Sequence, residues 1–79
     1  MHIETDQSAI ATVLSEGECE DNFFTRIDEK LCVIALVRHK WRRYVVNLQP
    51  SHAFALVGTT ADVHAAYLDA KARRVLCTI

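Results

Sequence analysis

The residues of this sequence with the widest chemical repertoire are three cysteines and four histidines, side chains that could together bind a transition metal. Zinc ligands usually occur in pairs only a few residues apart, and no such pair is present here. Cys32 lies in an apolar run, where a cysteine usually serves as a small buried hydrophobe. We therefore predict no metal-ligating residue and no cofactor. The candidate ligands are Cys19, Cys32, Cys77, His2, His39, His52 and His64.

The spacing of polar residues also gives little support to nucleophilic or acid–base catalysis. Cys19 lies between Glu18 and Glu20, and negative neighbours disfavour the thiolate that a nucleophile needs. The chain has no Gly-x-Ser-x-Gly, no glycine-rich phosphate loop and no His-Glu-x-x-His motif. The carboxylates of residues 16–21 are expected in water, without the contrasting environments of a catalytic acid–base pair. We predict no catalytic residue and a protein that is not an enzyme.

Charge is distributed unevenly along the chain. Residues 1–30 contain eight acidic and two basic side chains, a net charge of −6, whereas residues 31–79 contain seven basic and two acidic side chains, a net charge of +5. Such a separation can steer a charged partner toward one part of a surface. It is the strongest indication of function in the sequence.

The acidic segment from Glu16 to Asn22 is predicted to form a loop, because closely spaced like charges repel one another and belong in water. A cluster of carboxylates could imitate a run of phosphates and dock on a basic groove of another protein. A loop that only faces solvent is the alternative. The candidate partner-binding residues are Glu16, Glu18, Glu20, Asp21, Asp28 and Glu29.

A basic and aromatic segment extends from Arg38 to Tyr44. Cationic side chains that alternate with aromatic ones are typical of surfaces that hold phosphates and stack on bases. This pattern supports an alternative function, binding to nucleic acid or to an acidic partner. A solvated hairpin tip is the simpler interpretation. The candidate residues are Arg38, Lys40, Trp41, Arg42 and Arg43.

Apolar periodicity predicts the elements that position these residues. A helix capped by Thr5 or Asp6 is expected to end near residue 16. Strands are expected at residues 23–27, 31–37, 44–48 and 52–57, with a hairpin turn near residues 39–41. The continuous apolar run of residues 31–37 is typical of a strand covered on both faces. A helix over residues 28–37 is the alternative, because period alone does not distinguish the two in a short run.

The most strongly patterned element is a helix at residues 61–76, capped by Thr59 or Thr60. Its apolar stripe is predicted to face the sheet, and its polar side is a third candidate surface. The stripe consists of Ala61, Ala65, Leu68, Ala72, Val75 and Leu76, and the polar side of His64, Tyr67, Lys71 and Arg74.

Together these elements predict one α+β domain over residues 1–79. A three- to four-stranded, mostly antiparallel sheet would be packed on one face by the C-terminal helix and by a short N-terminal helix. The longest apolar run is too short for a membrane span, and three widely spaced cysteines indicate a reducing cytoplasm. A chain of 79 residues buries a small core, so a partner or a homodimer would help to stabilise it.

In its whole-chain character the sequence resembles the small phage-encoded inhibitors of CRISPR surveillance complexes, the anti-CRISPR proteins. The likeness consists of a 79-residue α/β chain, unpaired cysteines, the absence of a catalytic motif and the acidic segment from Glu16 to Asp21. The resemblance implies a stoichiometric inhibitor that blocks target-DNA binding by a Cascade-type effector in the cytoplasm of the host cell. The sequence therefore predicts a non-enzymatic, protein-binding inhibitor, with a small nucleic-acid-binding protein as the alternative.

Overall fold

The computed structural model describes residues 2–49 and 52–75 and has a five-stranded antiparallel sheet and two helices. The predicted α+β class is confirmed, whereas the predicted number of strands was too low. The additional strand is short and pairs with a later strand at one edge of the sheet. In chain order the elements are β1 (His2–Glu4), α1 (Gln7–Glu16), β2 (Glu18–Ile27), β3 (Lys30–His39), β4 (Arg42–Leu48), β5 (Phe54–Val57) and α2 (Thr60–Ala72).

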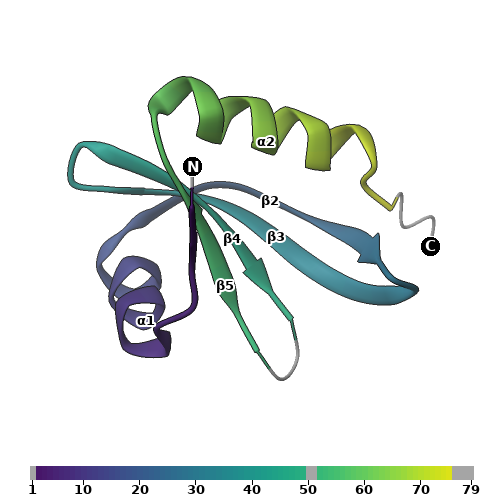
Figure 1. The fold of residues 1–79 in the computed structure, drawn as a ribbon, viewed down its shortest axis with the longest axis horizontal. Helices are drawn as coiled ribbons and strands as arrows, with labels where there is room; N and C mark the ends of the chain where they lie inside the picture. The colour runs from purple at the N-terminus through teal and green to yellow at the C-terminus, as the bar shows by residue number, and fades with distance from the viewer. Residues whose placement is uncertain (1, 50–51, 76–79) are drawn as a thin grey trace.

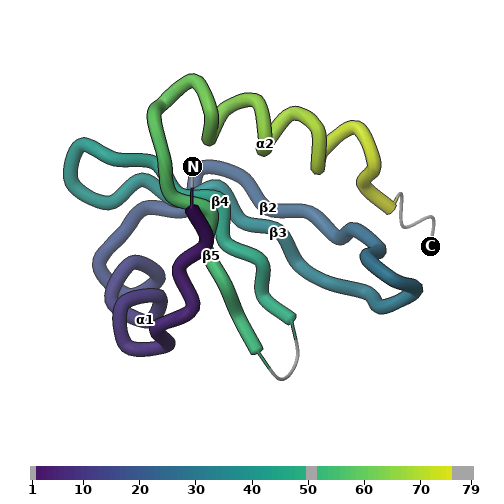
Figure 2. The backbone as a smooth tube through the Cα atoms, viewed as in Figure 1, coloured from purple at the N-terminus to yellow at the C-terminus, as the bar shows by residue number. Residues whose placement is uncertain are grey.

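The strand order across the sheet is β1-β5-β4-β3-β2. The alternative helix over residues 28–37 does not form, because β3 pairs with a strand on each side. Two-residue turns close the β2–β3 and β3–β4 hairpins, and Asp28, Glu29 and Lys40 adopt positive φ angles of 49°, 65° and 59° there. Figure 2 shows that these two turns lie at opposite ends of the longest dimension of the molecule.

The two helices cover opposite faces of the sheet, one above it and one below it in Figure 1. α1 packs in a core with Ala35 and Val37 of β3, while α2 packs in a core with Ile34 and Leu36. Successive residues of a strand point to opposite faces, so the continuous apolar run supplies both cores. The predicted coverage of this strand on both faces is confirmed, and the placement of both helices on one face was wrong. We call these faces the α1 face and the α2 face.

The acidic segment is not the predicted loop: Glu16 ends α1, and the residues from Glu18 onward form the first half of β2. Glu18 pairs with Arg38 and Asp21 with Leu36, with a bulge between Cys19 and Asp21. Repulsion among the carboxylates does not prevent strand formation, because basic side chains of β3, β4 and α2 lie close to them.

α2 does not turn its predicted apolar stripe toward the sheet, and of the side predicted to face solvent His64 and Arg74 are exposed while Tyr67 packs on the sheet. Val63 is 1% exposed and packs with Tyr67 and Ala70 against the sheet, whereas Leu68 remains 50% exposed. The alanines at positions 61, 65 and 72 are exposed with it. Alanine offers little apolar area, so burial of Val63 and of the tyrosine ring stabilises the interface more.

α2 also ends earlier than predicted, at Ala72, and residue 76 lies outside the described residues. Beyond the helix, the Val75 N–H donates to the Phe24 carbonyl at 2.8 Å. After the helix ends, the chain therefore runs beside the free edge of β2. There it donates a hydrogen bond to a strand carbonyl instead of continuing the helical hydrogen bonds.

Of the predicted N-cap residues, Asp6 begins α1 and Thr59 begins α2. The side chains of Asp6 and Thr59 accept first-turn backbone N–H groups at 3.0 and 3.1 Å. Gly17 follows α1 but has a φ of −82°, outside the left-handed region. A Cβ at this position would lie 2.5 Å from Val37 Cγ1, so glycine allows the end of α1 to approach β3 closely.

Candidate interaction surface

Two arginines on the α2 face form the second cross-strand pair from the β3–β4 turn, and we call this pair the base of the hairpin tip. Arg38 and Arg43 lie directly opposite each other in register, a placement that is destabilising for like charges. Glu18 and Glu20 of β2 offset this repulsion. Glu18 Oε2 lies 2.6 Å from Arg38 Nη2, and Glu20 Oε1 lies 2.7 Å from Arg43 Nε. Glu20 falls in the bulge of β2 and reaches past β3 to β4.

These contacts neutralise the base of the tip. The hydrogen bond from Arg43 holds the pKa of Glu20 below its ordinary value, and the same bond raises the pKa of Arg43. The Arg38–Glu18 pair is exposed at 51% and 70%, so solvent screens it. The two acidic and two basic formal charges cancel.

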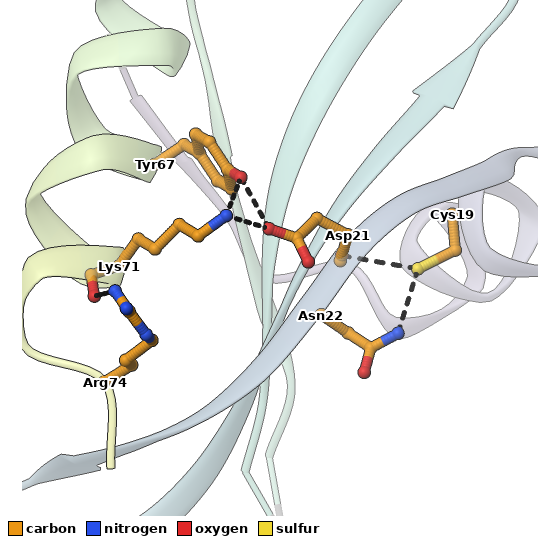
Figure 3. Close-up of polar contacts among 6 residues, drawn as sticks. All are labelled: Cys19, Asp21, Asn22, Tyr67, Lys71 and Arg74. Atoms are coloured by element: carbon orange, nitrogen blue, oxygen red, sulfur yellow. Dashed lines mark hydrogen bonds and ion pairs between the residues drawn. The ribbon is translucent and has the colours of Figure 1, made fainter. Parts of the chain in front are cut away.

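A second charged cluster attaches α2 to β2. Figure 3 shows the Asp21 carboxylate facing two side chains of the helix: the Tyr67 hydroxyl donates to Asp21 Oδ2 at 2.5 Å, and Lys71 Nζ donates to it at 2.8 Å. Lys71 Nζ also lies 3.0 Å from the tyrosine oxygen. Because Tyr67 and Lys71 are four residues apart, they lie on one side of the helix.

The same cluster controls the ionisation of its members. The hydrogen bonds from Lys71 and then Tyr67 lower the pKa of Asp21, and the hydrogen bond to Asp21 is the largest cause of the raised pKa of Lys71. Asp21 was a candidate partner-binding residue, but its carboxylate is engaged within the fold. Sequence reasoning missed this role because it placed Tyr67 and Lys71 on the solvent side. Their four-residue spacing was the one signal that could have indicated a shared acidic partner.

The tip of the β3–β4 hairpin differs from its base. Lys40 and Trp41 form the turn, and Arg42 begins β4. Within residues 2–49 and 52–75, neither Lys40 nor Arg42 takes part in a salt bridge. Trp41 is 88% exposed, more than any other large hydrophobic residue in those ranges. A hollow of about 290 Å³ adjoins the turn, lined by these three side chains with His39 and Tyr44.

The six acidic candidates do not form one surface. Glu16 lies 3.5 Å from His39 on the α1 side of the hairpin, whereas Glu18, Glu20 and Asp21 are used on the α2 face. The acidic residues of the β2–β3 turn are at the other end of the strand, about 30 Å from the start of β2 at the usual rise per residue. These turn residues are Asp28 and Glu29, and both are exposed.

The cysteines and histidines remain dispersed. Among the residues that the structure describes, no three His, Cys, Asp or Glu side chains are grouped so as to hold a metal ion. Cys32 is buried, as predicted, and Cys77 lies outside the described residues. Cys19 is exposed, and its Sγ donates to the Asp21 carbonyl at 3.4 Å and accepts from Asn22 Nδ2 at 3.7 Å (Figure 3).

In the two described ranges, neither helix has the length and apolar character that a membrane crossing requires. Comparisons with protein-family models, with curated proteins and with solved structures find no match for the chain.

Proposed function

We propose that this protein is a non-enzymatic binding module that inhibits another protein by docking on it through the tip of the β3–β4 hairpin. The observation that carries the proposal is the 88% exposure of Trp41 in a two-residue turn. An indole ring exposed to water lacks the favourable free energy that burial of its apolar surface would give. Tryptophan is among the residues most enriched at energetically dominant positions of interfaces. The hairpin holds this side chain away from both cores.

The charges beside Trp41 define the partner. Lys40 and Arg42 flank the indole, and neither is neutralised by a salt bridge within the described residues. The complementary surface is an apolar pocket with an acidic rim, which would bury the ring and steer the approach of the tip. The hollow beside the turn would admit a side chain of the partner.

The resemblance to anti-CRISPR proteins makes a Cascade-type effector complex the first partner to test. In this version the tip occupies an acidic patch of the effector, and target DNA is excluded because the body of the inhibitor overlaps its path. The acidic residues of β2 contribute to this activity by supporting the hairpin rather than by imitating phosphates.

A second candidate function is nucleic-acid binding by the same tip. Trp41 offers a face on which a base can stack, and Lys40 and Arg42 are placed to contact phosphates. This alternative predicts an affinity that falls steeply as salt increases. An electrophoretic mobility assay with a short single-stranded oligonucleotide at low salt separates it from protein binding.

The test compares the wild-type protein with Trp41→Ala in capturing a purified Cascade-type effector, before and after nuclease treatment. Loss of this anchor should weaken nuclease-resistant binding by at least about 30-fold, as expected for a dominant interface tryptophan. Leu68→Ala is the matched control, because Leu68 is also an exposed large apolar residue but lies on α2. Its affinity should not change.

Each outcome decides between the alternatives. Capture that resists nuclease and depends on Trp41 supports the inhibitor. Capture that nuclease abolishes, together with a mobility shift of the oligonucleotide, supports the second candidate. Binding that Trp41→Ala leaves unchanged contradicts both functions, since both use the tip.

A further inference from the structure

A cavity lies between α2 and the sheet, toward the C-terminal end of the helix. Its volume is about 310 Å³. Its walls are mainly aliphatic and aromatic side chains contributed by α2 and by four strands of the sheet. Those that matter here are Ile34, Val45, Phe54, Leu56, Ala66 and Ala70.

One buried polar group interrupts this apolar lining. Asn47 of β4 lines the cavity and is only 3% exposed. Its Oδ1 atom is buried and has no hydrogen-bond partner among residues 2–49 and 52–75. A buried amide oxygen without a donor is costly, and most such groups in folded proteins are paired. The register explains its direction, because Asn47 lies opposite Ile34 and therefore points to the α2 face.

The other polar residues that line the cavity satisfy each other. Asp69 and Arg73 of α2 form an ion pair of 2.6 Å, and both side chains are about 70% exposed to solvent. They therefore lie at the mouth rather than in the interior. The interior is a half-open apolar space, and among the described residues that line it Asn47 supplies the one buried acceptor without a donor.

We propose that this cavity binds a small, largely apolar molecule with one hydroxyl group, an aliphatic or aromatic alcohol, whose O–H donates to Asn47 Oδ1. A hydroxyl suits the site because it can donate to the amide oxygen and also accept from the amide nitrogen. Cavities of about 150 Å³ hold benzene, so this volume suits a ligand of roughly ten non-hydrogen atoms. A charged ligand would find no counter-ion inside.

This inference goes beyond the proposed function and is independent of it. The cavity uses residues of β4, β5 and α2, whereas docking uses Lys40, Trp41 and Arg42 of the hairpin tip. A ligand in the cavity would contact the same helix that Asp21 holds on the sheet. Failure of either proposal leaves the other standing.

The test uses two probes of the same shape, 4-ethylphenol and 4-ethyltoluene, in which a methyl group replaces the hydroxyl. Titration of the wild-type protein is followed by two-dimensional NMR of its backbone amides, methyl groups and Asn47 side-chain amide. We expect saturable binding of 4-ethylphenol, at least about tenfold tighter than that of 4-ethyltoluene, because only the phenol satisfies the buried acceptor. The largest shifts should fall on Asn47, Ala66 and Ala70.

Two variants and one matched control sharpen the result. Asn47→Leu removes the acceptor and should abolish the preference for the phenol, and its own thermal stability should be equal to or above that of the wild type. Ala66→Leu fills the cavity and should abolish binding of both probes. Ala65→Leu changes the neighbouring alanine on the exposed side of α2 and should bind as the wild type does.

The proposal is overturned if 4-ethylphenol gives no saturable shifts up to millimolar concentration, which would mean that water alone occupies the site. It is also overturned if the two probes bind equally well, or if the shifts map outside the cavity. Since the comparison of probes uses the wild-type protein, the result stands even if a variant fails to fold.

Discussion

Two adjacent parts of the β3–β4 hairpin, its tip and the cross-strand pair at the base of the tip, carry the same kind of charge in different surroundings. At the base, Arg38 and Arg43 meet carboxylates of β2 at 2.6 and 2.7 Å. At its tip, Lys40 and Arg42 have no salt bridge within the described residues, and Trp41 between them is exposed. The base uses its charges to hold three strands together, while the tip leaves its charges available.

This contrast shows why net charge along a sequence is a poor measure of surface potential. The acidic and basic segments are separated in the chain but adjacent in the fold, so the ion pairs of Glu18, Glu20 and Asp21 cancel part of the apparent polarity. Among the described residues, Lys40 and Arg42 remain unpaired beside Trp41 at the hairpin tip, and Asp28 and Glu29 remain exposed at the other end of the molecule. Charges that remain unpaired in the folded protein are therefore a better guide to a binding site than the most highly charged segment of the sequence.

The largest expected effect comes from breaking the engaged cluster. Asp21→Ala should lower the free energy of unfolding by about 2 kcal/mol, because Tyr67 and Lys71 lose a shared acceptor at a helix–sheet interface. The double variant Lys40→Ala/Arg42→Ala should change it by less than about 0.5 kcal/mol, as usual for exposed side chains. Urea unfolding followed by circular dichroism measures both. Equal losses would mean that the tip also stabilises the fold.

A smaller effect should follow from enlarging the unpaired positive charge at the tip. Glu18→Gln/Glu20→Gln frees Arg38 and Arg43, and the affinity for an acidic partner should rise by up to about tenfold, with a stronger dependence on salt. Surface plasmon resonance at two ionic strengths tests this.

The control for that variant is Asp28→Asn/Glu29→Gln, which changes the net charge equally at the other end of the molecule. It should leave affinity nearly unchanged, since exposed charges further apart than the Debye length are largely screened. An equal rise in both variants would attribute the gain to net charge rather than to the position of the arginines.

The smallest effect is the response to acid. In the folded protein the pKa values of Glu20 and Asp21 lie below their ordinary values of 4.5 and 3.8, so the unfolded chain binds these protons more readily. Their stabilising contribution is complete above the unfolded values and is lost as the pH falls through the folded ones. The urea midpoint should therefore decrease between about pH 5 and pH 3. Asp21→Asn should show a shallower decrease, and an identical one would contradict the assignment.

Features that depend on neighbours in the chain were predictable from the sequence. The apolar run in β3, the turn of the β3–β4 hairpin and the caps at Asp6 and Thr59 all formed as expected. Each is determined within a few residues, by side-chain periodicity or by a hydrogen bond to the next helical turn. The α+β class follows from the same local patterns.

Features that depend on distant partners were not predictable. Carboxylates on a strand repel one another locally, and only β3, β4 and α2 supply the cations that make β2 stable. The side of α2 that faces the sheet depends on Tyr67 reaching Asp21, 46 residues away in the chain. The sequence by itself determined where α1, β3, β4 and β5 lie and where α2 begins. The tertiary structure decided which charges cancel and which remain at the hairpin tip, because Coulomb and hydrogen-bond energies depend on distance in space rather than on separation in the chain.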